Sequence, residues 1–108
     1  MRTIVVLGND QMGQGDPALG RKILGNFLRK SVAMRDLAAI VFFNHGVKLV
    51  AAESPVLADL RQLHDNGVEI MPCGTCLEYY KIEPAVSRAS NMDEIIRVLS
   101  AAEKTITL

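Results

Sequence analysis

Apolar positions along the chain fall into two patterns of different period. Short runs rich in β-branched residues predict buried strands at Thr3–Leu7 and at residues 38–43, 68–71 and 104–108, with residues 47–51 as a further candidate. Because these runs are almost continuously apolar, they favour strands that are covered on both faces, as in a parallel sheet.

Between the strands, apolar residues recur at helical spacing. The first helix is capped by Asp16, and its predicted inward stripe consists of Leu19, Ile23, Phe27 and Leu28. The second helix is predicted to begin with Ser54 as its cap and Pro55 at its first position, and to end at Asn66 and Gly67.

Two shorter helices complete the pattern. One is predicted to start at the cysteines, and the other near residues 90–91 with Ile95, Ile96 and Leu99 facing inward. Strands that alternate with helices predict a single α/β domain over residues 1–108, a three-layer α/β/α sandwich with a mostly parallel sheet of about five strands. In such sheets, ligands and reactive groups collect where the strands end.

Composition and charge narrow the function classes. Twelve Lys plus Arg balance twelve Asp plus Glu, and aromatic residues make up only 5%, so neither a phosphate-neutralising surface nor a base-stacking platform is expected. We therefore expect no nucleic-acid partner. No apolar run approaches the roughly 20 residues of a membrane helix, and strand-like residues begin directly after Arg2, so we expect no membrane partner, no leader and a cytoplasmic location.

The loop after the first strand contains Met12, Gly13, Gly15 and Asp16, and it imitates a nucleotide-binding fingerprint. The acidic residue that such a site needs after the second strand is absent, since Phe43 is followed by Asn44. Turn chemistry is the better interpretation: Gly13 and Gly15 supply positive φ angles, and Asp16 caps the next helix. We expect no cofactor.

The loop after the second strand places Asn44, His45, Gly46 and Lys48 directly behind a buried segment. These residues could form an ordinary turn. If they lie near a thiol, the imidazole of His45 could act as a base or stabilise a thiolate, and Lys48 offers a fixed positive charge for the same purpose.

The most informative motif is Cys73-Gly74-Thr75-Cys76, between a predicted strand and a predicted helix. Unpaired N–H groups at a helix start favour the thiolate, so Cys73 is predicted to be the exposed attacking group, with Cys76 about one turn further as a resolving or shielding thiol.

Three other interpretations of the cysteine pair stay open. Structural zinc needs four ligands and finds only one CxxC here, so no metal is expected. The cysteines could be packed as small apolar residues, in which case the protein would be a non-catalytic binding module. The spacing also suits a thiol–disulfide oxidoreductase.

Taken together, several segments resemble the DsrE/DsrF-like family, and most closely the C-terminal domain of YedF-type selenium-metabolism proteins. The segments that carry the resemblance are residues 12–16, Leu19-Gly20, 43–49, 54–57, 67–70, Cys73 to Leu77 with Tyr80, and 90–92. The resemblance implies a three-layer α/β/α fold with five strands, working as a homo- or hetero-oligomer, often a trimer or hexamer.

The resemblance also implies a function. Family members with known roles relay sulfur as a persulfide, and the position of their active cysteine corresponds to Cys73 here, with Cys76 as a second cysteine. We therefore predict a small relay protein that accepts sulfane sulfur, or selenium, on Cys73 and passes it to a partner thiol. YedF-type proteins carry a TusA-like domain that this sequence does not contain, so the donor or acceptor is expected to be a TusA-like or other separate protein.

Overall fold

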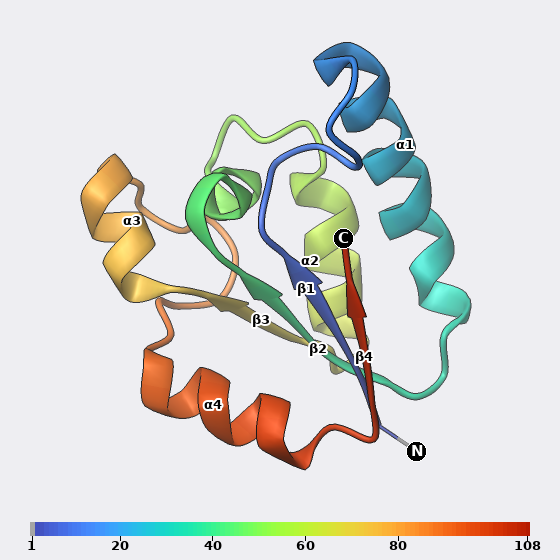
Figure 1. Cartoon of the computed structure of the whole chain (residues 1–108), viewed down its shortest axis with the longest axis vertical. Helices are drawn as coiled ribbons and strands as arrows, with labels where there is room; N and C mark the ends of the chain where they lie inside the picture. The colour runs from blue at the N-terminus through green and yellow to red at the C-terminus, as the bar shows by residue number, and fades with distance from the viewer. Residues whose placement is uncertain (1) are drawn as a thin grey trace.

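The computed structural model describes residues 2–108 and contains one parallel sheet with strand order β3-β2-β1-β4 (Figure 1). In chain order, the elements are β1 (Thr3–Leu7), α1 (Pro17–Lys30), the 3₁₀ helix η1 (Ser31–Ala33), β2 (Leu37–Phe42), the 3₁₀ helix η2 (Asn44–Val50), α2 (Leu57–Asp65), β3 (Glu69–Pro72), α3 (Gly74–Tyr80), α4 (Met92–Ala101) and β4 (Lys104–Thr107).

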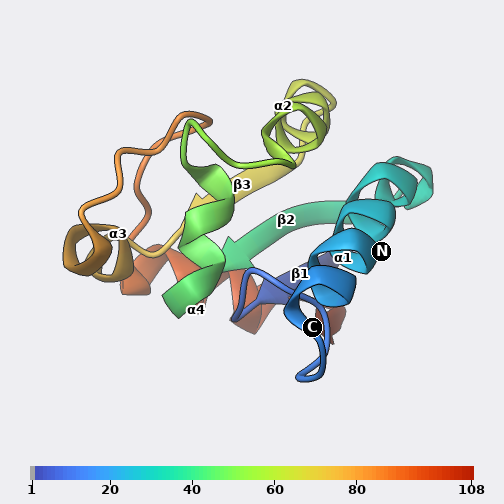
Figure 2. The same ribbon diagram turned by 90° about the horizontal axis from the view of Figure 1, so that it is seen from above.

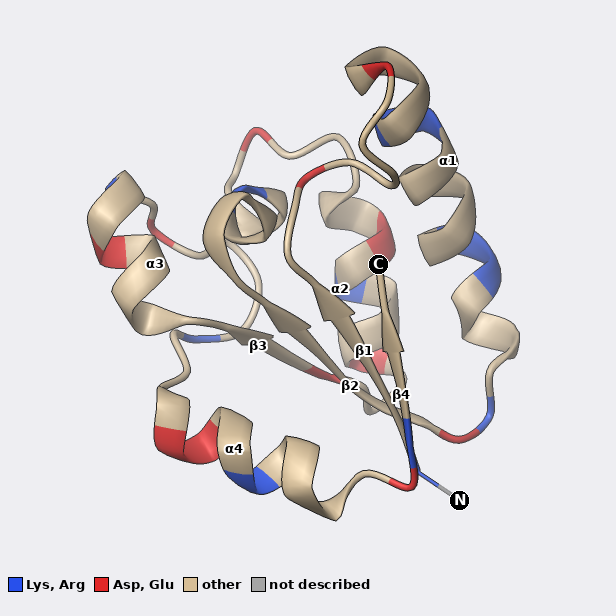
Figure 3. Ribbon diagram, in the orientation of Figure 1, with Lys and Arg blue, Asp and Glu red and all other residues tan. Residues whose placement is uncertain are grey.

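The predicted three-layer architecture is confirmed. Helices α1 and α2 cover one face of the sheet and α4 covers the other (Figure 2). All three strand pairings are parallel, and the charged residues lie mainly in the helices and loops rather than in β1 and β2 (Figure 3). The central strands are apolar along almost their whole length because both of their faces are buried.

The sheet has four strands in the described residues, and the prediction of a fifth at residues 47–51 is wrong. That segment belongs to η2 and its end. Val47 and Val50 are both fully buried, and a spacing of three places them on one side of a 3₁₀ helix. A short buried apolar segment can be either strand or helix, and only the packing against the sheet decides between them.

Helix α1 starts as predicted, but a different stripe faces the core. Asp16 accepts the Leu19 N–H at 2.8 Å, and Pro17 is the first helical residue. Leu24 and Leu28 are buried, whereas Leu19 is 56% and Ile23 37% exposed. The predicted stripe was therefore correct for Leu28 and wrong for its N-terminal half, which stays on the surface.

The boundaries of α2 were predicted correctly only at its end. Ser54 accepts the Val56 N–H at 3.2 Å in a turn, and the helix begins at Leu57 rather than at Pro55. At the other end, Gly67 adopts a φ of +96°, the left-handed conformation that terminates a helix after Asn66.

Helix α4 begins where the sequence predicted. Asn91 accepts the Glu94 N–H at 2.9 Å, and Ile95 is fully buried. Ile96, however, is 55% exposed, contrary to the prediction. Ile96 therefore lies on the side of α4 that faces away from the core.

Candidate functional site

The chemistry-bearing segments meet at the carboxyl edge of the sheet. Strand β2 leads into η2 and the neighbouring β3 leads into α3, so the starts of these two helices lie side by side (Figure 1). The register pairs Phe42 with Pro72, and the Cys73 N–H donates to the Phe42 carbonyl at 3.0 Å. Pairing of adjacent parallel strands thus places Asn44 to Lys48 next to the cysteine motif, as the predicted site required.

Cys73 is the N-cap residue of α3, but it is buried rather than exposed. Its exposed fraction is 4%, and its side chain belongs to the hydrophobic core. The segment before α4 covers it, because the Ser90 N–H donates to the Pro72 carbonyl at 2.8 Å and the Gly74 N–H donates to the Ser90 carbonyl at 3.0 Å. The predicted helix-start position is confirmed, and the predicted exposure is wrong.

Cys76 is the more accessible thiol of the pair. It is half-buried, and its Sγ accepts the backbone N–H of Asn44 at 3.2 Å. Burial raises the pKa of the Cys76 thiol; the Asn44 N–H opposes this, while the hydrogen bond and the electrostatic interaction with Cys73 raise the pKa further. At neutral pH the proton is therefore retained on Cys76, in contact with the Cys73 sulfur.

A polar and aromatic cluster surrounds the outer end of this pair. The Tyr80 hydroxyl donates to the Asn44 side-chain oxygen at 2.5 Å. The His45 ring packs edge-on against Tyr80 with centroids 5.4 Å apart, and Lys48 Nζ lies 5.2 Å from the Tyr80 ring centroid. His45 and Lys48 are thus held by the phenol ring, and among the described contacts neither reaches a sulfur atom.

Two glycines permit the close approach of these segments. A Cβ at Gly46 would lie 2.2 Å from the Leu7 carbonyl oxygen, so η2 can sit against the end of β1 only without a side chain there. A Cβ at Gly74 would lie 2.7 Å from the Ser90 carbonyl oxygen. The first spacer residue of the CxxC motif is therefore fixed by packing, whereas Thr75, the second, is exposed.

The residues of the loop after β1 shape the start of α1 and lie outside the cysteine site. Gly13 has the predicted positive φ, +81°, but Gly15 does not, so that prediction is wrong for Gly15. The Asp16 carboxylate is occupied as the α1 cap, and Met12 lines a groove along α1 with Ile23. The structure therefore does not bring Met12, Gly13, Gly15 or Asp16 into the described contacts of the cysteines.

Sequence reasoning missed a network that holds the cover of Cys73. The Ser90 hydroxyl donates to Glu94 at 2.9 Å, and Arg88 forms an ion pair with Glu94 at 2.9 Å. Arg88 and then Ser90 lower the pKa of the Glu94 carboxyl by hydrogen bonding. The spacing of Ser90 and Glu94 across the start of α4 was visible in the sequence, but nothing there linked it to Cys73.

Within residues 2–108, no group of three or more His, Cys, Asp or Glu side chains is arranged to hold a metal ion. No helix in the same part of the chain is both long and apolar enough to cross a bilayer.

The family follows from comparison with known proteins. The model of the DsrE/DsrF-like family matches residues 12–108. The chain belongs to this family. The sequence matches no curated protein, so the family assignment names no individual relative with an established activity.

Solved structures support the fold of the family. The ychN protein from E. coli superimposes with a TM-score of 0.73 at 20% identity, covering 100% of both chains. MTH1491 from Methanobacterium thermoautotrophicum, described as a protein of unknown function, gives a TM-score of 0.70 at 16% identity and covers 99% of this chain and 98% of its own. At these identities the likeness extends to the fold alone.

Proposed function

We propose that this member of the DsrE/DsrF-like family is a sulfur-relay protein in which the Cys73–Cys76 pair carries a sulfane sulfur atom as a persulfide. The observation that carries the proposal is the pairing of a half-buried thiol, Cys76, with a buried one, Cys73, at the carboxyl edge of the sheet. Both are free thiols, the form that a reducing cytoplasm maintains and that a persulfide carrier requires.

The difference in exposure gives the relay an order. A donor persulfide meets Cys76 first, because Cys73 is covered by the Ser90 segment. Cys76 gives up its proton as its sulfur attacks the outer sulfur of the donor, the donor's sulfur–sulfur bond breaks, and the departing donor thiolate takes up that proton. The N–H of Asn44 is positioned to stabilise the negative charge on Cys76 during this attack.

The sulfur atom is then transferred from Cys76 to the buried Cys73, where it is stored. The Cys73 sulfur attacks the outer sulfur of the Cys76 persulfide, and the proton released there returns to Cys76, which again becomes a thiol. The persulfide on Cys73 is thereby shielded from adventitious thiols by the same contacts that exclude the donor. Delivery reverses these steps toward an acceptor thiol, so no external oxidant or reductant is consumed.

Mass spectrometry of the intact protein and its peptides tests the proposal. After incubation with a persulfide donor, the wild type should gain about 32 Da, one sulfur atom, on Cys73. Cys73→Ser should retain the atom on Cys76, and Cys76→Ser should load Cys73 much more slowly. A gain in mass that is absent from all three proteins would eliminate the relay, and a larger increment from a selenium donor would identify selenium as cargo.

The same samples decide between the relay and its two rivals. A thiol–disulfide oxidoreductase would instead lose two hydrogens by forming a Cys73–Cys76 disulfide and would reduce a disulfide substrate. A non-catalytic binding module would leave both cysteines unmodified. Thr75→Ala is a suitable control, because Thr75 is exposed within the motif and its side chain makes no described contact.

Self-association is part of the same proposal. The exposed half of α1 presents Leu19 and Ile23 beside a groove of about 380 Å³ that is lined mainly by apolar side chains. Such a surface favours contact with another copy of the chain, as a trimer or hexamer, or with a TusA-like or other donor. Native mass spectrometry of Ile23→Glu should show a smaller assembly than the wild type, with Lys22→Glu as the control.

A further inference from the structure

A cavity of about 510 Å³ opens at the carboxyl edge of the sheet, beyond the outer end of the cysteine site. It lies between the loop after β1, the start of α1, η2 with the chain that follows it, and the end of α3. Its volume lies within the range of about 300–1,000 Å³ that is usual for small-molecule sites. The position at the ends of parallel strands is also where α/β sheets bind ligands.

The cavity is lined by apolar side chains at its base and by two pairs of oppositely charged side chains around them. Buried side chains of α1 and η2, such as Leu24 and Leu49, form part of the floor. Asp10 and Arg21 stand on the side of β1 and α1, while Lys48 and Glu53 stand on the side of η2. In the part of the chain that the structure describes, none of these four side chains takes part in an ion pair.

This charge pattern selects a class of ligand. A simple anion would be attracted by Arg21 and Lys48 but repelled by Asp10 and Glu53. An uncharged apolar molecule would remove water from all four charges without replacing it. A zwitterion that carries an ammonium and a carboxylate at its two ends satisfies both signs and leaves its middle for the apolar floor.

The cavity is linked to the cysteines through α3. Cys76 and Tyr80 are four residues apart and therefore lie on the same face of that helix, about 6 Å apart along its axis. Tyr80 lines the cavity and donates to Asn44, whose N–H in turn contacts the Cys76 sulfur. A molecule seated against Tyr80 and Lys48 could thus direct a short side chain toward Cys76.

We propose that this cavity binds a small zwitterionic thiol compound, a cysteine-containing amino acid or short peptide, as the low-molecular-weight donor or acceptor of the relay. This inference rests on the proposed function for the identity of the sulfur group. The binding of the zwitterionic part rests on the cavity alone.

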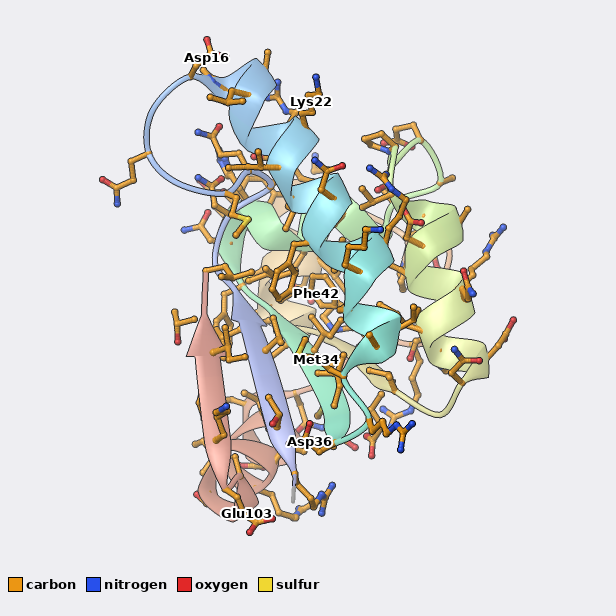
Figure 4. The ribbon with its side chains drawn as sticks, turned by 90° about the vertical axis from the view of Figure 1, so that its right-hand side faces the viewer. Asp16, Lys22, Met34, Asp36, Phe42 and Glu103 are labelled. Carbon is orange, nitrogen blue, oxygen red and sulfur yellow. The ribbon has the colours of Figure 1, made fainter. Side chains whose placement is uncertain are left out.

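The test uses a ligand whose sulfur cannot be transferred. S-methylcysteinylglycine, which has one ammonium and one carboxylate, is titrated into the whole protein and followed by backbone NMR. We expect saturable shifts at residues 48–56 and 80–82. Arg21→Gln and Glu53→Gln should each weaken binding about tenfold. Lys22→Gln, on the exposed outer side of α1 (Figure 4), is the matched control and should change affinity by less than about twofold.

Three results would overturn the inference. They are the absence of saturable shifts, equal binding of the dicarboxylate succinate or of butylamine, and an equal loss of affinity in the Lys22 control. The titration is repeated with Cys73→Ser and Cys76→Ser, which keep the cavity. Dipeptide binding without any sulfur loading would refute the relay and support the cavity as a binding site. Sulfur loading from inorganic polysulfide without dipeptide binding would support the relay and refute the cavity as a binding site.

Discussion

Replacing Gly46 with alanine tests the packing that places η2 beside the cysteines. The new Cβ would lie 2.2 Å from the Leu7 carbonyl oxygen and 3.1 Å from the Leu7 carbonyl carbon. Both atoms belong to the backbone at the end of β1, where Leu7 is buried and the Phe43 N–H donates to the same carbonyl at 3.0 Å. Neither partner can therefore move without disturbing the core.

The expected cost follows from this geometry. Carbon atoms in good contact are about 3.5–4.0 Å apart, so relief requires either a shift of η2 away from β1 or a distortion of β1 itself. Overpacking of this kind costs about 1–3 kcal/mol and occasionally more. Because backbone atoms rather than a flexible side chain are involved, we expect a loss of about 3 kcal/mol in the free energy of unfolding. For a domain of this size, such a loss lowers the melting temperature by roughly 10–20 °C.

Urea unfolding followed by circular dichroism measures the effect. Gly8→Ala is the matched control, since Gly8 also follows β1 but has no neighbour within 4 Å of the position a Cβ would occupy. The control should change the unfolding free energy by no more than about 0.5 kcal/mol. If Gly46→Ala proves as stable as Gly8→Ala, with unchanged dependence on urea, then η2 does not pack against β1 as described.

Three further outcomes are expected. Gly74→Ala should push the Ser90 cover away from the start of α3 and raise the alkylation rate of Cys73 in the folded protein, measured by peptide mass spectrometry; an unchanged rate would contradict the proposed cover. Because burial raises the pKa of Cys76 above the usual 9.0, the alkylation rate of Cys76 should still be increasing at pH 9. Cys73→Ser removes contacts that raise this pKa, so it should shift the pH profile of the Cys76 alkylation rate to lower pH. A plateau of the rate near neutral pH would show that the pKa of Cys76 is not raised. The folded-state pKa of Glu94 lies below its ordinary value of 4.5, so the stability that the ionised Glu94 contributes is present above pH 4.5 and is lost as the pH falls through the folded-state pKa. The urea midpoints of the wild type and of Glu94→Gln should therefore differ at pH 7 and converge in acid. In the control, Glu83→Gln, the difference from the wild-type midpoint should stay constant with pH.

Sequence rules that involve only neighbouring residues correctly predicted helix caps and the positive φ of a helix-ending glycine. The Asp16 cap with Pro17 behind it, the positive φ of Gly67 and the Asn91 cap all involve contacts within a few residues. The two central strands could be predicted because burial on both faces leaves them almost entirely apolar, with Thr3 at the start of β1 as the exception. The meeting of the cysteine motif with Asn44 followed from parallel pairing, which aligns the ends of adjacent strands.

Long-range packing decided the features that were predicted wrongly. Residues 47–51 carry a pattern that suits a strand, yet they belong to η2 and its end, and Gly46 of η2 packs closely against the Leu7 carbonyl oxygen at the end of β1. Leu19 and Ile23 obey helical spacing, but the side of α1 that carries Leu24 and Leu28 faces the core instead, so Leu19 and Ile23 stay exposed. Periodicity reports that a helix has an apolar face, and the shape of its neighbour determines how much of that face is buried.

The site divides in the same way. The sequence by itself determined that two thiols stand three residues apart where a strand gives way to a helix, because strand and helix periods and the CxxC spacing are all local. Only the tertiary structure decided which thiol meets solvent, because the cover of Cys73 comes from Ser90, a residue that no local rule connects to it. It also decided that Tyr80 and Lys48 form both the outer wall of the cysteine cluster and part of a cavity, since a cavity is defined by surfaces brought together from the whole chain.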